Sequence, residues 1–97
     1  MTADAGWSAI VVHPDDDVAV ALRDLAAGAT IGVRRAGATL PVSVLEAIPL
    51  GHKLALHALA VGAPIRKYGE CIGEATRAIA TGEHVHVHNL VSRRGRT

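Results

Sequence analysis

The chain has 97 residues and a formal net charge of +1, with ten lysines and arginines against nine aspartates and glutamates. A chain of this length forms one small domain and buries little more than roughly 60% of its unfolded surface, so a partner would add stability. The near-neutral charge argues against nucleic-acid binding, and the lack of a leader or long apolar run argues against membrane insertion, so we expect a cytoplasmic protein.

The aliphatic composition limits what the core can contain. Phe is absent, Trp7 and Tyr68 are the large aromatics, and 18 residues are alanine, so Val, Ile, Leu and Ala must fill the core. The single Cys71 excludes an internal disulfide and a cysteine-based zinc cluster, which fits a reducing compartment. No base stands beside it in the sequence, which argues against a nucleophilic thiol.

Short apolar stretches separated by Pro and Gly predict an all-β domain. The expected strands are residues 8–13, 18–22, 39–45 and 65–68. Two stretches leave room for one or two helical turns. Residues 53–61 combine good helix formers with a strand-like alternation, and residues 74–79 are too few for periodicity to decide.

Three segments share the pattern apolar, x, x, Gly, x, x, β-branched, with Gly28, Gly62 and Gly82 at its centre. We expect each glycine to adopt a positive φ in a tight turn that leads into a strand. The three strands would begin with Thr-Ile, Pro-Ile and His-Val. The glycines are unequally spaced, which argues against a solenoid of fixed repeats.

Residues 84–89 read His-Val-His-Val-His-Asn and form the most conspicuous candidate site. In an extended strand His84, His86 and His88 would share one face, with Val85 and Val87 on the other. The outer two histidines would then lie roughly 13 Å apart, so one ion could not easily collect all three. The alternative interpretation is an exposed polar strand edge.

Strand geometry therefore predicts a two-histidine metal clamp, because a His-x-His pair spans only about 6.6 Å. The remaining ligands would come from His13, His52, the acidic run 15–17 or another chain. Asn89 would orient a ligand or hold a substrate hydroxyl.

Three other groups of residues are candidates for binding or catalysis, and each also has a structural interpretation. His13 and the acidic run 15–17 form either a carboxylate-rich corner or an Asx-type turn. The pair His52 and Lys53 follows a glycine turn and suits acid–base chemistry or carboxylate binding, unless it is a solvated turn. The segment 66–68 suits carboxylate binding or forms a charged strand edge. We expect His57 to be structural.

Five motifs in order cover nearly the whole chain. They are HPDDDVAVAL at 13–22, IPLGHK at 48–53, IRKYG at 65–69, IG at 72–73 and GEHVHVHN at 82–89. Together they resemble the SAF domain of the altronate and galactarate dehydratase group, which includes the small subunit of sulfolactate sulfo-lyase. Glu70 and Cys71 depart from the small apolar or proline-containing pair expected there, which leaves the substrate open.

The resemblance implies a β-clip fold over residues 8–91, between a flexible N-terminus 1–7 and a flexible basic tail 92–97 to which we assign no role. It also implies a cytoplasmic hydro-lyase of sugar-acid catabolism that forms a 2-keto-3-deoxy acid. Its cofactor would be a divalent metal, with iron as the expected ion and manganese or zinc as the alternatives. The chain would be a separately encoded small subunit, inactive without a large catalytic subunit in a hetero-oligomer.

Under this hypothesis the candidate residues border an active site at the subunit interface. The expected catalytic residues are His13, His52 and Lys53, the expected substrate-binding residues are Lys67, Tyr68 and Asn89, and the expected metal ligands are His86 and His88 with His84 as a third candidate. The alternatives are a sulfolactate sulfo-lyase small subunit, a non-enzymatic SAF-type carbohydrate- or protein-binding module, and a metal-sensing or storage protein.

Overall fold

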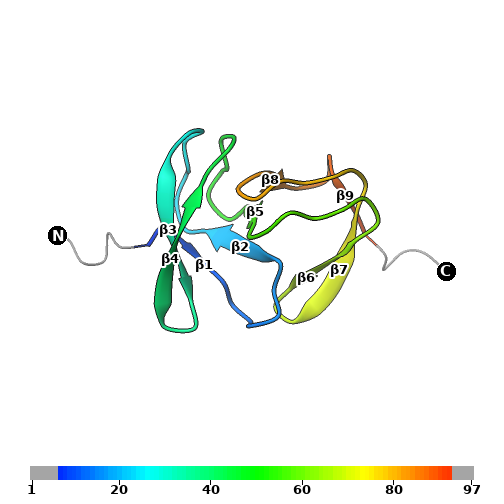
Figure 1. Ribbon diagram of the computed structural model, residues 1–97, viewed down its shortest axis with the longest axis horizontal. Helices are drawn as coiled ribbons and strands as arrows, with labels where there is room; N and C mark the ends of the chain where they lie inside the picture. The colour runs from blue at the N-terminus through cyan, green and yellow to red at the C-terminus, as the bar shows by residue number, and fades with distance from the viewer. Residues whose placement is uncertain (1–6, 93–97) are drawn as a thin grey trace.

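The computed structural model describes residues 7–92, and this part is built from strands and turns, as expected for an all-β domain (Figure 1). The N-terminal residues 1–6 and the basic tail with Arg93, Arg94 and Arg96 lie outside the described residues. The strands are β1 (Ala9–Ile10), β2 (Val18–Ala21), β3 (Thr30–Arg35), β4 (Ala38–Ser43), β5 (Lys53–Ala55), β6 (Pro64–Lys67), β7 (Glu70–Ala75), β8 (His84–Val85) and β9 (Leu90–Val91).

Each of the four predicted strand regions contains a strand, although β1 keeps only two residues of the stretch 8–13. Both undecided segments are strand-like in the structure. Residues 53–61 begin with β5, and residues 74–79 begin with the end of β7. No helical turn forms within residues 7–92, and so no helix there is long and apolar enough to cross a membrane.

The strands form two sheets, and the buried apolar side chains form two clusters. Six strands pair in the order β4-β3-β1-β2-β5-β8, and three pair in the order β6-β7-β9. Figure 1 shows the β3–β4 hairpin at one end of the molecule and the β6–β7 hairpin at the other, with β2 and β5 between them. One apolar cluster surrounds Val33, Val44 and Leu54, and the other surrounds Ile65 and Val85.

The three predicted glycine turns form as expected. Gly28, Gly62 and Gly82 have φ angles of 86°, 81° and 84°, and the strands β3, β6 and β8 follow them. A fourth turn of the same kind contains Gly51, with φ of 84°. The sequence pattern missed it because Leu54 stands where the other three segments have a β-branched residue.

The four turns pair two by two through their leading apolar residues. Leu25 and Ile48 exchange two backbone hydrogen bonds of 2.8 and 2.9 Å, and Leu59 and Ile79 exchange two of 2.8 Å. All four side chains are buried. These isolated bridges connect turns that are far apart in the sequence, and they set the positions from which the strands begin.

The acidic run 15–17 fastens the loop before β2 to the β6–β7 hairpin. Asp16 is 3% exposed, and its carboxylate accepts hydrogen bonds from the backbone N–H groups of His13, Tyr68 and Gly69 at 3.1, 3.0 and 2.8 Å. Asp17 accepts from the backbone N–H of Arg66 at 2.8 Å. Buried carboxylates that accept several N–H groups stabilise a fold, which supports the structural interpretation of this run.

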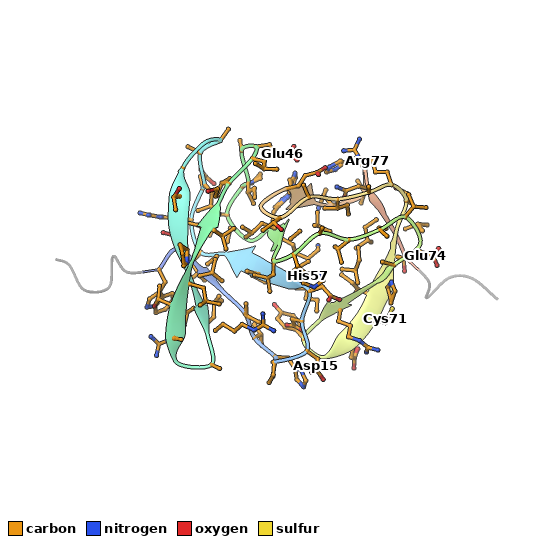
Figure 2. The ribbon with its side chains drawn as sticks, in the orientation of Figure 1. Asp15, Glu46, His57, Cys71, Glu74 and Arg77 are labelled. Atoms are coloured by element: carbon orange, nitrogen blue, oxygen red, sulfur yellow. The ribbon has the colours of Figure 1, made fainter. Side chains whose placement is uncertain are left out.

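His57, which we expected to be structural, contributes to the same corner. Its Nε2 lies 2.9 Å from the Asp17 carboxylate, and its Nδ1 lies 3.1 Å from the carbonyl oxygen of Ala58. Figure 2 places Asp15 and Glu46 at opposite sides of the view, with His57 between them. The acidic corner is therefore well separated from the loop that carries Glu46.

Gly82 and Gly62 form a matched pair for testing how tightly the turns are packed. A Cβ on Gly82 would collide with the carbonyl oxygen of Ser43, whereas a Cβ on Gly62 meets nothing within 4 Å. We expect Gly62→Ala to lower the free energy of unfolding by about 1–2 kcal/mol because of its positive φ. Gly82→Ala should cost roughly 1–3 kcal/mol more. Urea unfolding followed by circular dichroism measures both, and equal losses would contradict the collision.

The acidic run offers a second matched pair. We expect Asp16→Asn to lower the free energy of unfolding by about 2–4 kcal/mol, because the buried carboxylate loses charge-assisted hydrogen bonds. Asp15 has a side chain that is 75% exposed. Asp15→Asn should therefore stay within about 0.5 kcal/mol of the unsubstituted protein. Similar losses in both variants, measured by urea unfolding, would rule out the anchoring role of Asp16.

Candidate functional site

The histidine-rich segment is a strand followed by a turn, and the expectation of an extended strand is wrong beyond Val85. β8 ends at Val85, which is fully buried as predicted, and residues 86–89 form a turn. Val87 was expected to point inward, but it sits in this turn with 81% of its side chain exposed.

Asn89 holds the turn in place. It is fully buried, its Oδ1 accepts from the backbone N–H of His86 at 2.9 Å, and its Nδ2 donates to the carbonyl oxygen of His84 at 2.8 Å. The backbone N–H of Asn89 also donates to the carbonyl oxygen of His86. Because both ends of the amide are occupied, Asn89 is placed to position the histidines.

The turn brings the histidines together. The ring centroids of His84 and His88 lie 5.3 Å apart, and those of His84 and His86 lie 5.4 Å apart. This is far less than the separation of roughly 13 Å that an extended strand would give for the outer pair. The geometric argument against collecting all three imidazoles in one place therefore no longer applies.

A fourth imidazole comes from a different part of the chain. β5 pairs with β8 so that Leu54 lies opposite His84, which places His52 beside the turn. The His52 ring stacks on His86 at 4.4 Å, and its Nδ1 lies 2.9 Å from the Nε2 of His84. We call His52, His84, His86 and His88 the histidine cluster.

Two sets of side chains in the described part of the chain have ligand atoms close enough to hold a metal ion. In each set the atoms lie within 4.8 Å of one another. One set is His52, His84 and His86, and the other is Glu46, His84 and His88. His84 belongs to both sets. Three nitrogen ligands with open positions suit Fe²⁺, Mn²⁺ or Zn²⁺.

Glu46 was not singled out by the sequence pattern. Its carboxylate accepts a hydrogen bond from the backbone N–H of His84 at 3.1 Å. The neighbouring Leu45 donates its backbone N–H to the carbonyl oxygen of Gly82 at 3.0 Å, which holds this loop against the turn before β8. The contact joins residues 38 positions apart, and no local motif signals it.

The environment of the cluster disfavours protonation of His84 and His86. Partial burial, followed by His52, His88 and His86, lowers the pKa of His84, and Glu46 opposes this shift. Partial burial and the neighbouring His52, Lys53 and His88 lower the pKa of His86. Neutral imidazole is the form that binds metals, so the environment favours ligation.

Lys53 adjoins the cluster at the start of β5. Burial lowers its pKa, and the ammonium of Lys67 lowers it further. Lys67 lies with its nitrogen 4.6 Å from the ring centroid of Tyr68. The structure thus brings Lys53 and Lys67 together beside the imidazoles, and lysine side chains suit an anionic ligand.

The structure places His13 at the acidic corner, where the backbone N–H of Tyr68 also donates to Asp16. Its ring lies against Gly69, and its Nδ1 accepts the backbone N–H of Asp15 at 3.1 Å. Neither His13 nor any aspartate of residues 7–92 belongs to the two sets of possible metal ligands. Of the remote ligands that we considered within this chain, His52 alone joins the cluster.

The lowered pKa of His84 predicts a stability that depends on pH. Its ordinary value is 6.5, so the unfolded chain binds more protons than the folded chain below that pH. The contribution is complete above about pH 6.5 and is lost as the pH falls toward the folded pKa. We expect His84→Asn to lose less stability than the unsubstituted protein between about pH 7.5 and pH 5.5. Thermal unfolding in metal-free buffer measures this, and equal losses would contradict it.

Comparison with known proteins agrees with this architecture. Residues 7–93 match the family described as the altronate/galactarate dehydratase SAF domain. The altronate dehydratase of Escherichia coli (strain K12) is 48% identical over 80 residues, which are 82% of this chain and 15% of that enzyme. The altronate dehydratase of Bacillus subtilis (strain 168) is 40% identical over 82 residues, 84% of this chain and 16% of that enzyme.

A relative of similar length also matches. The (2R)-sulfolactate sulfo-lyase subunit alpha of Chromohalobacter salexigens is 41% identical over 88 residues, which are 87% of this chain and 94% of that subunit. This chain therefore spans nearly all of a lyase subunit but only a small part of the altronate dehydratases. Since the family match runs over residues 7–93, the chain belongs to the altronate/galactarate dehydratase SAF domain family.

Proposed function

We propose that this chain is the small subunit of a metal-dependent sugar-acid dehydratase. The enzyme would be an altronate-type hydro-lyase that yields a 2-keto-3-deoxy acid and is active only with a large catalytic subunit. The observation that carries the proposal is the histidine cluster beside Lys53, fixed by the buried Asn89. The relatives of altronate dehydratase type contain a matching segment within a much longer chain.

The cluster would hold the metal through His52, His84 and His86, and Glu46 and His88 form a second possible set with His84. When bound, a divalent cation, expected to be Fe²⁺ with Mn²⁺ or Zn²⁺ as alternatives, would stabilise the charge that develops on the substrate carboxylate during elimination. The lowered pKa values of His84 and His86 keep nitrogen lone pairs free for this role near neutral pH.

Lys53 would move the proton. Its lowered pKa favours a neutral amine, which removes the proton from the carbon next to the carboxylate. The released electron pair forms a carbon–carbon double bond as the hydroxyl on the next carbon leaves. The ammonium of Lys53 returns its proton to that hydroxyl, so one water is lost, and the resulting enol becomes the keto acid. Lys67 and Tyr68 would bind the carboxylate and hydroxyls of the substrate.

A second candidate is the small subunit of a sulfolactate sulfo-lyase. The 41% identity to a sulfo-lyase subunit alpha favours this candidate, because the match covers 94% of that subunit. The same residues would act, with sulfite leaving in place of hydroxide. Assays of the two-subunit enzyme on altronate, galactarate and sulfolactate separate the two candidates.

His84→Ala tests the proposal most directly, because His84 belongs to both possible ligand sets. We expect this variant, copurified with its large subunit, to lose at least about 100-fold in turnover and about tenfold in affinity for Fe²⁺. His57→Ala is the control, because His57 is bonded to Asp17 outside the cluster and should leave both quantities close to normal.

Anaerobic Fe²⁺ titration and steady-state assays on the three acids provide the readouts. Full activity of His84→Ala would exclude the proposed metal centre. Tight Fe²⁺ binding without any dehydratase or sulfo-lyase activity of the reconstituted pair would instead favour a metal-sensing or storage protein. Activity against none of the acids together with no Fe²⁺ binding would favour a non-enzymatic module.

A further inference from the structure

Three exposed apolar residues lie in the segments that carry the candidate site. Val87, in the turn after β8, is 81% exposed, Leu50 is 61% exposed and Leu45 is 55% exposed. Each is close in sequence to a member of the candidate site. Leu45 precedes Glu46, Leu50 lies two residues before His52, and Val87 stands between His86 and His88. We call Leu45, Leu50 and Val87 the apolar rim.

The backbone of the rim is held by hydrogen bonds. The N–H of Leu50 donates to the carboxylate of Asp24 at 2.8 Å, and the N–H of Leu45 donates to the carbonyl oxygen of Gly82 at 3.0 Å. The turn that carries Val87 is closed by the fully buried Asn89. Side chains presented from fixed backbone lose little conformational freedom on association, which is a property of preformed binding surfaces.

The segments that carry the rim meet at the histidine cluster. The carboxylate of Glu46, next to Leu45, accepts a hydrogen bond from the backbone N–H of His84 at 3.1 Å. The ring of His52, two residues after Leu50, stacks on His86, next to Val87, at 4.4 Å. The rim and the cluster therefore belong to one region of the surface.

We infer that the apolar rim and the histidine cluster form one face that docks onto the catalytic subunit. This inference rests on the proposed function. The catalytic subunit is the expected occupant of this face. The segment that matches this chain makes up 15% of the Escherichia coli altronate dehydratase, so in that enzyme this segment and the rest of the sequence are one polypeptide. The sulfo-lyase relative of similar length to this chain is a separate protein that is named a subunit.

Site-specific photocrosslinking in the organism that encodes this chain tests the docking face. A photoreactive phenylalanine derivative is placed at Leu45, Val87 or Val12 of the full chain. Val12 is a matched control because it is 54% exposed and precedes a histidine, yet it lies in the loop that carries Asp15, on the other side of the view from Glu46 (Figure 2).

We expect positions 45 and 87 to crosslink to one polypeptide that resembles the catalytic part of altronate dehydratase. Mass spectrometry of the crosslinked peptide should identify that polypeptide, and position 12 should give no product with it. In a second measurement, Val87→Asp should weaken copurification of the same polypeptide at least about tenfold, whereas Val12→Asp should not.

Three results would overturn the docking face. They are crosslinks only to a second copy of this chain, an equal yield from position 12, and no crosslink from positions 45 and 87. Neither readout requires metal or turnover, so the docking face can fail while the metal centre stands. Conversely, crosslinking as expected together with a fully active His84→Ala variant would support the docking face and exclude the metal centre.

Discussion

Four glycines with left-handed backbone conformations stand where tight turns lead into strands, and both sheets depend on them. The strands are two to six residues long, so each contributes few ladder hydrogen bonds. The turns compensate by pairing through Leu25 with Ile48 and Leu59 with Ile79. Only glycine adopts a φ between 81° and 86° at little cost, so these positions tolerate few substitutions.

The same turns build the site. The chain leaves the Gly51 turn directly into His52 and Lys53, and it leaves the Gly82 turn into His84. Because β5 and β8 are paired, the residues that follow two distant turns become neighbours. Asn89 then reverses the chain and adds His86 and His88. The cluster is therefore a consequence of how turns and strands meet, and one buried amide completes it.

Four imidazoles lie together at ring separations of 4.4 to 5.4 Å, although His52 comes from a distant part of the sequence. Under the proposed function their nitrogens would hold a divalent cation, and Lys53 and Lys67 stand beside them for an anionic substrate. Under the same proposal, covering exposed apolar side chains such as Val87 would stabilise a small domain with little core, so assembly and completion of the site would occur together.

The sequence alone determined the all-β class, three of the glycine turns, the inward position of Val85 and most members of the histidine cluster. These properties follow from local rules, because alternation, turn chemistry and residue type act over a few positions. Tertiary structure decided the rest. His52 and His84 are 32 residues apart and meet only through strand pairing, and Glu46 joins them through a loop that no motif marks. The turn at 86–89 replaced the expected strand because the side chain of Asn89 satisfies backbone groups that a further ladder would have used, and sequence periodicity does not encode such a bond.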